Sequence, residues 1–511
     1  MTEASPTTSP NPNAVLVVVM VGTFLSVLDT TILNVALPYI VTSFGSNVEE
    51  VKWVTTGFMI AAASTMPLTS WLGQRFGYGN LYIAALSVFT AGAAMSAMSW
   101  TLDSLIFARI VQGMGAGLVQ PASIAILSRS FPPRVRGRAF GIWTIGMMTA
   151  PTLGPTTGGL MIEFFNWRSI FSLSLLVGGL AVLLAVTILS REREKPPLGF
   201  DWKGYSSFTV AMVAAFLVVT YGQQEGWTSG IILLGCAVSL VAFVLFLIVE
   251  WDAEQPIVPL RLFRIPDFSL TLFLTLYRSL GLFGGVFLLP IFLYQVQGRD
   301  SVEIGLMMIP GSIVMAIMSP ISGVLTDRFG GKWPAIVGIV FMAYFLYLYQ
   351  SVDFLSARWL ILYPQIFQGM GIALVMTPLI TTGMNAVNRE DGGHASWMIN
   401  LCQRGGGAFS ISILGTMLHR ETIIQKDYLG GSTILRQAPP EALVQQGMSL
   451  GLSSQEARPA AMAAVGRMLG QAALSQAFKN IFILCAIVTI TAIVPALLLS
   501  SRRPIPEGEA D

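Results

Sequence analysis

The chain contains the stretch Leu105-Ile-Phe-Ala-Arg-Ile-Val-Gln-Gly-Met-Gly115, which recurs as Ile361-Leu-Tyr-Pro-Gln-Ile-Phe-Gln-Gly-Met-Gly371 at an offset of 256 residues. A shorter pair, Gln74-Arg-Phe-Gly77 and Asp327-Arg-Phe-Gly330, recurs in the same order at an offset of 253 residues. Chance similarity between apolar segments is disfavoured, because polar positions match as well. The nearly equal offsets therefore indicate an internal duplication, and parallel repeats around a central site are typical of membrane transporters.

Composition places the chain in a membrane. Of its 511 residues, 54% are hydrophobic and 11% are charged, whereas soluble globular chains carry about 25% charged residues. So few charges cannot cover a water-facing surface, and a bilayer removes that difficulty. The net charge of +2 gives no indication of a nucleic-acid partner. The three cysteines lie in apolar runs and the two histidines at segment ends, so we expect no metal site and no disulfide framework.

Fourteen apolar runs are long enough to cross the bilayer, since a hydrocarbon core of about 30 Å needs about 20 residues of helix. The runs are Ala14–Ile40, Val51–Leu72, Leu81–Ser99, Leu105–Leu127, Ala139–Ile162, Ser169–Leu189, Tyr205–Tyr221, Gly230–Trp251, Phe268–Tyr294, Ile304–Leu325, Trp333–Gln350, Trp359–Met384, Ala395–Leu418 and Ile481–Ser500. The repeat relates the fourth run to the twelfth and the second to the tenth. The seventh and eighth are therefore inserted between two halves of six.

The distribution of basic residues predicts the orientation. Sixteen Lys and Arg lie in the loops after even-numbered runs and in the C-terminal tail, against four in the other short loops. By the positive-inside rule both termini are cytoplasmic. The first thirteen residues carry no Lys or Arg, so they are predicted to be a disordered tail rather than a secretory signal.

The predicted fold is all-α and integral to the membrane, with two six-helix bundles and two inserted central helices. The predicted parts are a tail (1–13), an N-terminal bundle (14–190), the inserted pair with its linkers (191–266), a C-terminal bundle (267–500) that contains a long extracytoplasmic loop (419–480), and a second tail (501–511).

Two charged residues lie deep in apolar runs of the first half. Asp29 stands within Leu28-Asp-Thr-Thr-Ile-Leu-Asn-Val-Ala-Leu-Pro38, and Arg109 stands within the repeated stretch. Such charges are costly in lipid, and they usually face a partner or a cavity and serve a function. Because the first run leads outward and the fourth inward, both residues lie toward the outer half and can interact. A carboxylate there can load and release a proton, whereas the alternative is a purely structural bond or ion pair.

Two further motifs concern packing and closure. Gly141-x8-Ala150-x3-Gly154-Pro155-x2-Gly158-Gly159 combines small residues, which let helices approach, with a proline that removes an amide. The loop Gly323-x-x-x-Asp327-Arg328-x-Gly330-Gly331-Lys332 repeats an earlier loop in which Gln74 stands in place of the Asp.

Together these four motifs and the helix plan resemble the fourteen-helix drug/proton antiporters of the major facilitator superfamily. The resemblance implies that Asp29 and Arg109 couple transport to protons, and that the motif with Gly154, Pro155, Gly158 and Gly159 marks an antiporter and hence export. It also implies that Asp327 and Arg328 hold an inward gate closed, although positive-inside charge without a gating role is an alternative. The energy source implied is the proton gradient, without a cofactor.

The segment from His419 to Asn480 is similar to the corresponding loop of EmrB-type exporters, as are Phe200-Asp-Trp-Lys-Gly204 and Pro256-Ile-Val-Pro-Leu-Arg-Leu-Phe263 to that branch. That resemblance implies the inner membrane, with a periplasmic membrane-fusion adaptor and an outer-membrane channel as partners. An insertion without a partner is the alternative.

The substrate is expected to be a small amphiphile. Arg278 and Arg404 add two more deep positive charges, so deep charge totals about +2 with Asp29 and Arg109 included. This favours neutral or anionic compounds over quaternary cations, unless both arginines snorkel or pair with backbone carbonyls. The other residues predicted to line the substrate cavity are Asn400, Gln403, Trp143, Met147, Tyr277, Phe283, Phe287 and Trp397.

Other functions are disfavoured. The sequence has no Walker motif or nucleophile elbow, which disfavours an ATP-driven pump and an enzyme. A lipid or metabolite exporter of the same fold stays open, as does a ligand sensor that does not transport, although sensing needs no proton acceptor in the membrane.

Overall fold

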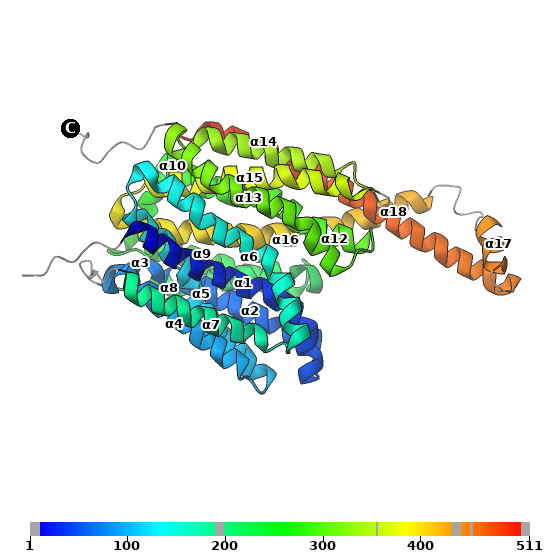
Figure 1. The fold of residues 1–511 in the computed structure, drawn as a ribbon, viewed down its shortest axis with the longest axis horizontal. Helices are drawn as coiled ribbons and strands as arrows, with labels where there is room; N and C mark the ends of the chain where they lie inside the picture. Colours follow the sequence, from blue (N-terminus) through cyan, green and yellow to red (C-terminus); the bar gives the residue numbers. More distant parts are fainter. Residues whose placement is uncertain (1–10, 190–198, 354–355, 432–440, 450–452, 502–511) are drawn as a thin grey trace, which may run out of the picture.

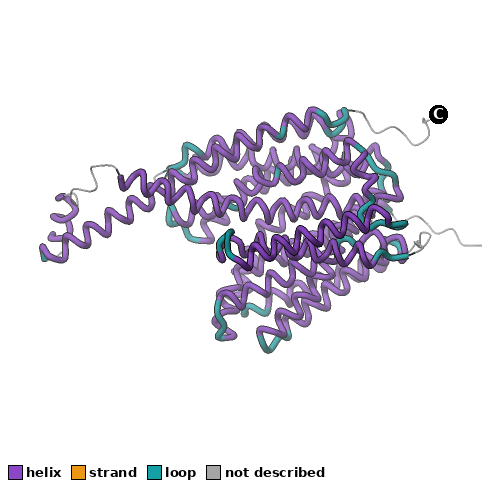
Figure 2. Tube along the Cα trace, turned by 180° about the vertical axis from the view of Figure 1, so that it is seen from behind, coloured by secondary structure: helices purple, strands orange, loops and turns teal. Residues whose placement is uncertain are grey.

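The computed structural model describes residues 11–189, 199–353, 356–431, 441–449 and 453–501, and every regular element among them is a helix (Figure 2). The first half contains α1 (Pro12–Phe44), α2 (Val48–Thr65), α3 (Leu68–Phe76), α4 (Tyr78–Ala97), α5 (Leu102–Ser130), η1 (Pro133–Val135), α6 (Arg136–Phe164) and α7 (Ser169–Ile188). The inserted pair is α8 (Trp202–Glu225) and α9 (Gly230–Asp252), followed by η2 (Leu260–Arg264). The second half contains α10 (Pro266–Tyr277), α11 (Ser279–Val286), α12 (Leu288–Gln295), α13 (Ser301–Phe329), α14 (Lys332–Tyr349), α15 (Arg358–Asn385), η3 (Arg389–Asp391), α16 (Gly392–Gly431), α17 (Glu441–Ser449), α18 (Ser454–Thr491) and α19 (Ile493–Leu497).

Eleven of the described helical segments are long and apolar enough to cross a membrane. Helices α2, α6 and α16, which correspond to the other three predicted runs, are richer in polar and small residues. The eleven segments are compatible with fourteen spans, a count that stays a prediction. The predicted tails and the charges at 191–195 lie largely outside the described residues; residues 12 and 13, predicted as tail, already belong to α1.

The two halves repeat the same close helix contacts, which confirms the duplication. A Cβ on Gly113 of α5 would lie 2.4 Å from the Phe58 carbonyl oxygen, and one on Gly369 of α15 would lie 2.3 Å from the Gly311 carbonyl oxygen. Gly115 and Gly371 repeat this relationship against α4 and α14. These glycines are needed because any side chain there would separate the helix backbones.

Two predicted runs are interrupted in the structure. Pro67, which lacks a backbone N–H, lies between α2 and α3. The ninth run, Phe268–Tyr294, divides into α10, α11 and α12 at Arg278 and Phe287. The first interruption shapes a groove and the second holds a buried charge.

Helix α8 contacts both halves. Tyr205 Oη donates to the Ser64 carbonyl oxygen of α2 at 3.1 Å, and Ser412 Oγ of α16 donates to the Val219 carbonyl oxygen at 3.0 Å. In the most apolar stretch of α8 and of α9 only 17% of residues are buried, against 78% in α5. The inserted pair therefore lies at the periphery, along the seam between α2 and α16.

One end of the bundle, hereafter the terminal end, holds the beginning of α1 and the end of α19 (Figure 1). At the opposite, distal end α16 and α18 extend beyond the other helices as a hairpin (Figure 1). Much of the long segment 419–480, whose sequence is partly helical in pattern, is thus helix, because α16 continues to Gly431 and α18 begins at Ser454. Asn480 Nδ2 donates to Glu421 Oε1 at 2.6 Å and ties the two arms together.

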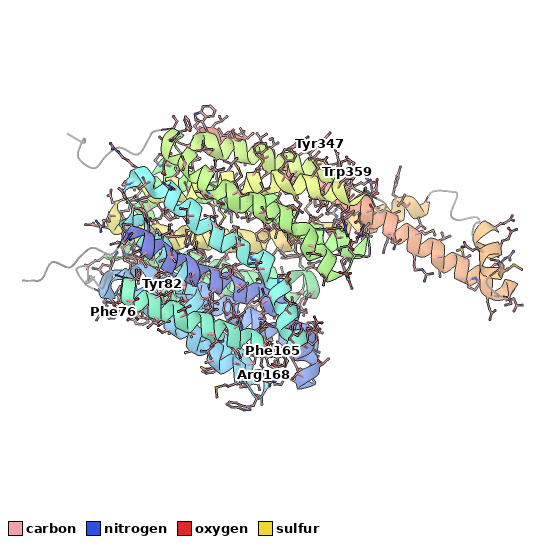
Figure 3. The ribbon with its side chains drawn as sticks, viewed as in Figure 1. Phe76, Tyr82, Phe165, Arg168, Tyr347 and Trp359 are labelled. Carbon is pink, nitrogen blue, oxygen red and sulfur yellow. The ribbon has the colours of Figure 1, made fainter. Side chains whose placement is uncertain are left out.

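Aromatic side chains are exposed near both ends of the bundle. Phe165 and Trp359 lie toward the distal end, where Arg168 also lies, and Phe76 lies toward the terminal end (Figure 3). Aromatic rings at these two levels are typical of the interfaces between lipid and water.

Candidate functional site

A buried ion pair joins α1 and α5 inside the first half. Arg109 Nη1 donates to Asp29 Oδ2 at 2.5 Å, and the two side chains are 0% and 3% exposed, respectively. The two residues predicted to couple to protons are therefore in direct contact. Charges so far from water are stable only when paired and hydrogen-bonded.

Two more polar side chains bind the Asp29 carboxylate. Gln112 Nε2 donates to Asp29 Oδ1 at 2.9 Å, while Gln112 Oε1 accepts from Arg109 Nη1 at 2.7 Å. Ser174 Oγ of α7 donates to the same Asp29 oxygen at 2.9 Å. One carboxylate thus receives three donors from two helices.

The Arg109 guanidinium has further contacts that do not depend on Asp29. Its Cζ lies 4.2 Å from the centre of the Phe58 ring and 5.7 Å from that of Phe171. Its Nε donates to the Val54 carbonyl oxygen at 3.5 Å. Because a ring face attracts a cation, these contacts hold the guanidinium independently of the carboxylate.

Small residues in α5 bring Arg109 close to α2, which carries Val54 and Phe58. Gly113 and Gly117 lie against the backbone of α2, where a Cβ would be 2.4 Å from the Phe58 carbonyl oxygen and 2.1 Å from the Ala62 carbonyl oxygen, respectively. Sequence reasoning found this stretch but missed Ser174, because a serine in an apolar helix usually bonds its own backbone. Ser174 does so as well, to the Ile170 carbonyl oxygen at 3.3 Å.

A stripe of polar residues on α16 faces the first half. Trp397, Asn400 and Arg404 follow one another at helical spacing, and Arg404 Nη2 donates to Gln120 Oε1 of α5 at 2.7 Å. Among the described residues, buried atoms without a hydrogen-bond partner include Trp397 Nε1, Arg404 Nε and both amide ends of Asn400 and of Gln403. Buried polar groups normally have partners, so these atoms are candidates for contact with a polar ligand.

Arg278 is the second deep cation of the C-terminal half. It lies at the interruption between α10 and α11, is 2% exposed, and has buried Nε and Nη1 atoms without a partner among the described residues. Asp29 pairs with Arg109, so the deep charges without an acidic partner among the described residues, Arg278 and Arg404, are both positive. The predicted excess of about +2 is thus carried by these two side chains.

The predicted aromatic and Met residues do not form one cluster. Trp143 and Trp397 are fully buried, and Trp143 Nε1 donates to Thr23 Oγ1 at 3.0 Å. The Tyr277 hydroxyl hydrogen-bonds Thr491 Oγ1 of α18 at 2.6 Å, and its ring stacks on Phe273. The half-buried residues are Met147, Phe283 and Phe287.

The halves meet at the terminal end through Asp327. Its Oδ1 accepts from the Gly137 amide at 2.8 Å and its Oδ2 from the Arg138 amide at 2.9 Å, at the N-terminus of α6. Arg328, predicted to act with it, is exposed and lies outside this contact. A carboxylate at a helix N-terminus is favourable because unpaired amides and the helix dipole attract it.

The glycine motif of α6 is only partly a packing device. A Cβ on Gly154 would lie 2.1 Å from Thr31 Oγ1, and one on Gly158 would lie 3.2 Å from Ile32 of α1. No described atom lies within 4 Å of a Cβ on Gly159. Helix α6 continues through Pro155 from Arg136 to Phe164.

Metal-ligating side chains do not gather in the part of the chain that the structure describes. No group of three or more His, Cys, Asp or Glu residues there could hold a metal ion. Cys236, Cys402 and Cys485 are free thiols.

Comparisons with known proteins agree with this architecture. Residues 19–411 match the family profile of the Major Facilitator Superfamily. The uncharacterized MFS-type transporter YhcA of Bacillus subtilis is 31% identical over 83% of this chain and 80% of its own length. The multidrug export protein EmrB of Escherichia coli is 30% identical over 85% of this chain and 86% of its own. The structure of the human organic anion transporter MFSD10 is similar with a TM-score of 0.58, at 13% identity over 94% of this chain and all of that one, which shows a shared fold.

The chain belongs to the major facilitator superfamily. It is a multi-pass membrane transporter of small molecules, and not an enzyme.

Proposed function

We propose that this transporter is a proton-coupled antiporter that exports amphiphilic drugs or toxic small molecules across the cytoplasmic membrane. The observation that carries the proposal is the buried Asp29 carboxylate, held by Arg109, Gln112 and Ser174. The relatives named for multidrug export, EmrB among them, support the substrate class and the direction. The proton gradient is the energy source, and no cofactor is involved.

The site can couple a proton to movement by a change of charge. When Asp29 is ionised, the three donors join α1, α5 and α7 through one carboxylate. Protonation removes that charge and leaves Arg109 with Gln112 Oε1, the Val54 carbonyl and two rings. The balance of contacts within the first half then differs between the two protonation states, which biases how it moves against the second half.

Substrate efflux from proteoliposomes with an imposed proton gradient tests this proposal. Asp29→Asn keeps the shape of the side chain, so gradient-driven efflux should be lost while substrate binding stays. Efflux that ignores the gradient in the parent protein, or that persists in Asp29→Asn, would overturn the proposed coupling and leave the fold unaffected.

We further propose that neutral or anionic amphiphiles are preferred, with Arg278, Arg404, Asn400 and Gln403 as the polar contacts. Arg278 and Arg404 lack an acidic partner among the described residues, so an anionic group would neutralise charge that is otherwise costly. Competition between a lipophilic weak acid and a quaternary dye tests the preference. Arg278→Gln should weaken binding and export of the acid more than those of the dye. Tight export of the dye that this change leaves unaffected would contradict the preference.

The same proteoliposomes distinguish this proposal from two alternative functions. A lipid or metabolite exporter would move labelled lipid or metabolite in preference to drugs. A sensor would bind ligand without any flux.

The location and partners are also proposals. Basic residues at the terminal end support cytoplasmic termini and a hairpin outside the inner membrane. The hairpin then offers a surface for a periplasmic membrane-fusion adaptor and, through it, an outer-membrane channel. Shortening the hairpin to a tight turn should abolish co-purification with an added adaptor while efflux from proteoliposomes continues.

A further inference from the structure

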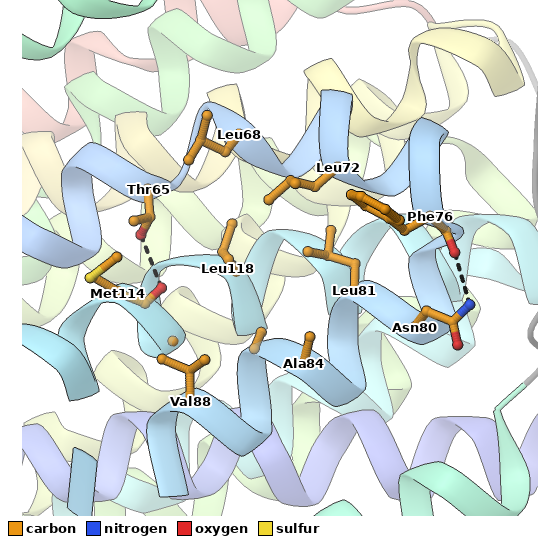
Figure 4. A pocket seen from close by; sticks show the side chains of 12 residues that line it. Thr65, Leu68, Leu72, Phe76, Asn80, Leu81, Ala84, Val88, Met114 and Leu118 are labelled. Atoms are coloured by element: carbon orange, nitrogen blue, oxygen red, sulfur yellow. Dashed lines mark hydrogen bonds between the residues drawn. The ribbon is translucent and has the colours of Figure 1, made fainter. Parts of the chain in front are cut away.

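A groove of about 600 Å³ lies beside the interruption between α2 and α3. Its walls are side chains of α2, α3, α4 and α5, and Figure 4 shows them converging on one elongated space. Phe76, Val88 and Met114 at its edge are 45%, 38% and 45% exposed, respectively. Because α4 and α5 are long and apolar enough to cross a membrane, we expect these side chains to be exposed to lipid.

The groove is almost entirely apolar. The two polar side chains in its wall are already engaged: Thr65 Oγ1 donates to the Met114 carbonyl oxygen at 3.1 Å, and Asn80 Nδ2 donates to the Phe76 carbonyl oxygen at 2.8 Å (Figure 4). The wall includes the small residues Ala84, Ala85 and Gly115, where α4 and α5 lie close together. From Asn80 to Val88 the groove follows α4 for about 12 Å, close to half of a hydrocarbon core of about 30 Å.

A positive charge stands at one end of this apolar groove. Arg75 Cζ lies 5.7 Å from the ring of Phe76, which lines the groove, and 5.2 Å from the ring of Trp71. Arg75 is exposed and has no ion-pair or hydrogen-bond partner among the described residues. A cation without a partner in the described part of the chain, next to apolar walls toward mid-membrane, matches an anionic head group with an acyl chain.

We propose that the groove binds one phospholipid of the leaflet at the terminal end, with its anionic head group on Arg75 and one acyl chain between α3 and α4. The site is separate from the Asp29 pair and does not depend on the proposed transport function. It lies next to the contact between halves, because Gly393 of α16 approaches Ser70 of α3. A Cβ on Gly393 would be 3.2 Å from the Ser70 Cα. A lipid in the groove would therefore brace α3 against α16.

Native mass spectrometry of the purified protein tests the head group. Phosphatidylglycerol and phosphatidylcholine with identical chains are added in equal amounts. We expect the parent protein to retain phosphatidylglycerol about fivefold better, since one basic residue at the membrane surface contributes about that factor. Arg75→Gln should remove the preference. Lys332→Gln is the matched control, because Lys332 also lies over an exposed ring, that of Trp333 at 5.7 Å, at the start of α14.

Filling the groove tests the acyl chain. Ala84→Trp places a bulky side chain inside it, whereas Ser87→Trp adds the same bulk to an exposed position of α4 that does not line it. The bound lipid should be lost in the first variant and kept in the second. Equal retention of both lipids by the parent, an unchanged preference in Arg75→Gln, lipid retained in Ala84→Trp, or displacement of the lipid by a transported dye would overturn the proposal.

Discussion

Gln368 of α15 packs so closely against Gly285 of α11 that a Cβ on the glycine would lie 2.5 Å from the amide nitrogen of Gln368. The residues 256 positions earlier are Gln112 and Asp29, and there the amide donates to the carboxylate at 2.9 Å. Gln365 likewise stands where Arg109 stands in the first half. The second half therefore keeps the framework of the site without its charges, and the ionisable pair belongs to the first half.

Introducing an acid and a base at the equivalent positions of the second half should show that each charge needs the other for stability. Gly285→Asp alone buries a carboxylate without a counter-charge, and we expect a large fall in thermal stability in detergent. Adding Gln365→Arg should recover part of it, with a coupling on the order of 3 kcal/mol, as for buried pairs that lose one member. Gly285→Asn reports the steric cost against Gln368 and Phe345 alone. Strictly additive effects would contradict a shared site.

Ser174 should matter more than its residue type suggests. Its hydroxyl donates to a buried carboxylate, and hydrogen bonds to charged groups contribute about 1.5–3 kcal/mol. Ser174→Ala should therefore lower the free energy of unfolding by about that amount and weaken gradient-driven efflux. Ser172→Ala in the same helix is the control, because Ser172 is exposed and bonds only its own backbone at 3.4 Å. Equal effects of the two changes would argue against the assigned role.

Closure at the terminal end should be sensitive to one methyl group. A Cβ on Gly323 of α13 would lie 2.2 Å from the Gly137 carbonyl oxygen, beside the bonds that Asp327 receives. Gly323→Ala should disfavour the closed state by about 1–3 kcal/mol. Distances between spin labels on the terminal ends of α6 and α13 should then shift to longer values. Gly305→Ala, in the same helix with no described atom within 4 Å, should leave them unchanged.

The glycine motif of α6 should divide into required and dispensable positions. Gly154→Ala meets Thr31 Oγ1 at 2.1 Å, so thermal stability should fall by about 1–3 kcal/mol. Gly159→Ala meets no described atom within 4 Å. It should keep or raise stability, because alanine is the better helix former by about 0.5–1 kcal/mol. The reverse order would contradict the packing roles assigned to Gly154 and Gly159.

Much of the fold follows from patterns that act locally. A repeated stretch with its glycines predicts equivalent helix contacts, because the same backbone approach needs the same missing side chain. Asp29 and Arg109 stand out because charges are rare in apolar runs. These signals required no knowledge of neighbouring helices.

The remainder depends on tertiary contacts that leave no mark in the sequence. Ser174 looks like any serine of an apolar helix, and the partners of Asp327 are backbone amides that every residue carries. The segment 419–480 is partly helical in its sequence pattern, but that pattern does not give the ends of its helices. Its first arm continues from the bundle as helix, supported by Gln425 Nε2 donating to Glu421 Oε1 at 2.9 Å one turn away. A capping box at Ser453 and Glu456 starts the second arm.

Because α18 is one continuous helix, it transmits a tilt of the second half to the distal hairpin. Its 38 residues form a rod of about 57 Å, nearly twice the thickness of a hydrocarbon core of about 30 Å. If such a rod turns by about 10° around the terminal end, its far tip sweeps about 10 Å. A small tilt inside the bilayer thus becomes a displacement as wide as a helix outside it. A protein bound to the tip is therefore displaced in each transport cycle. Conversely, a partner that fixes the tip in place prevents the second half from moving.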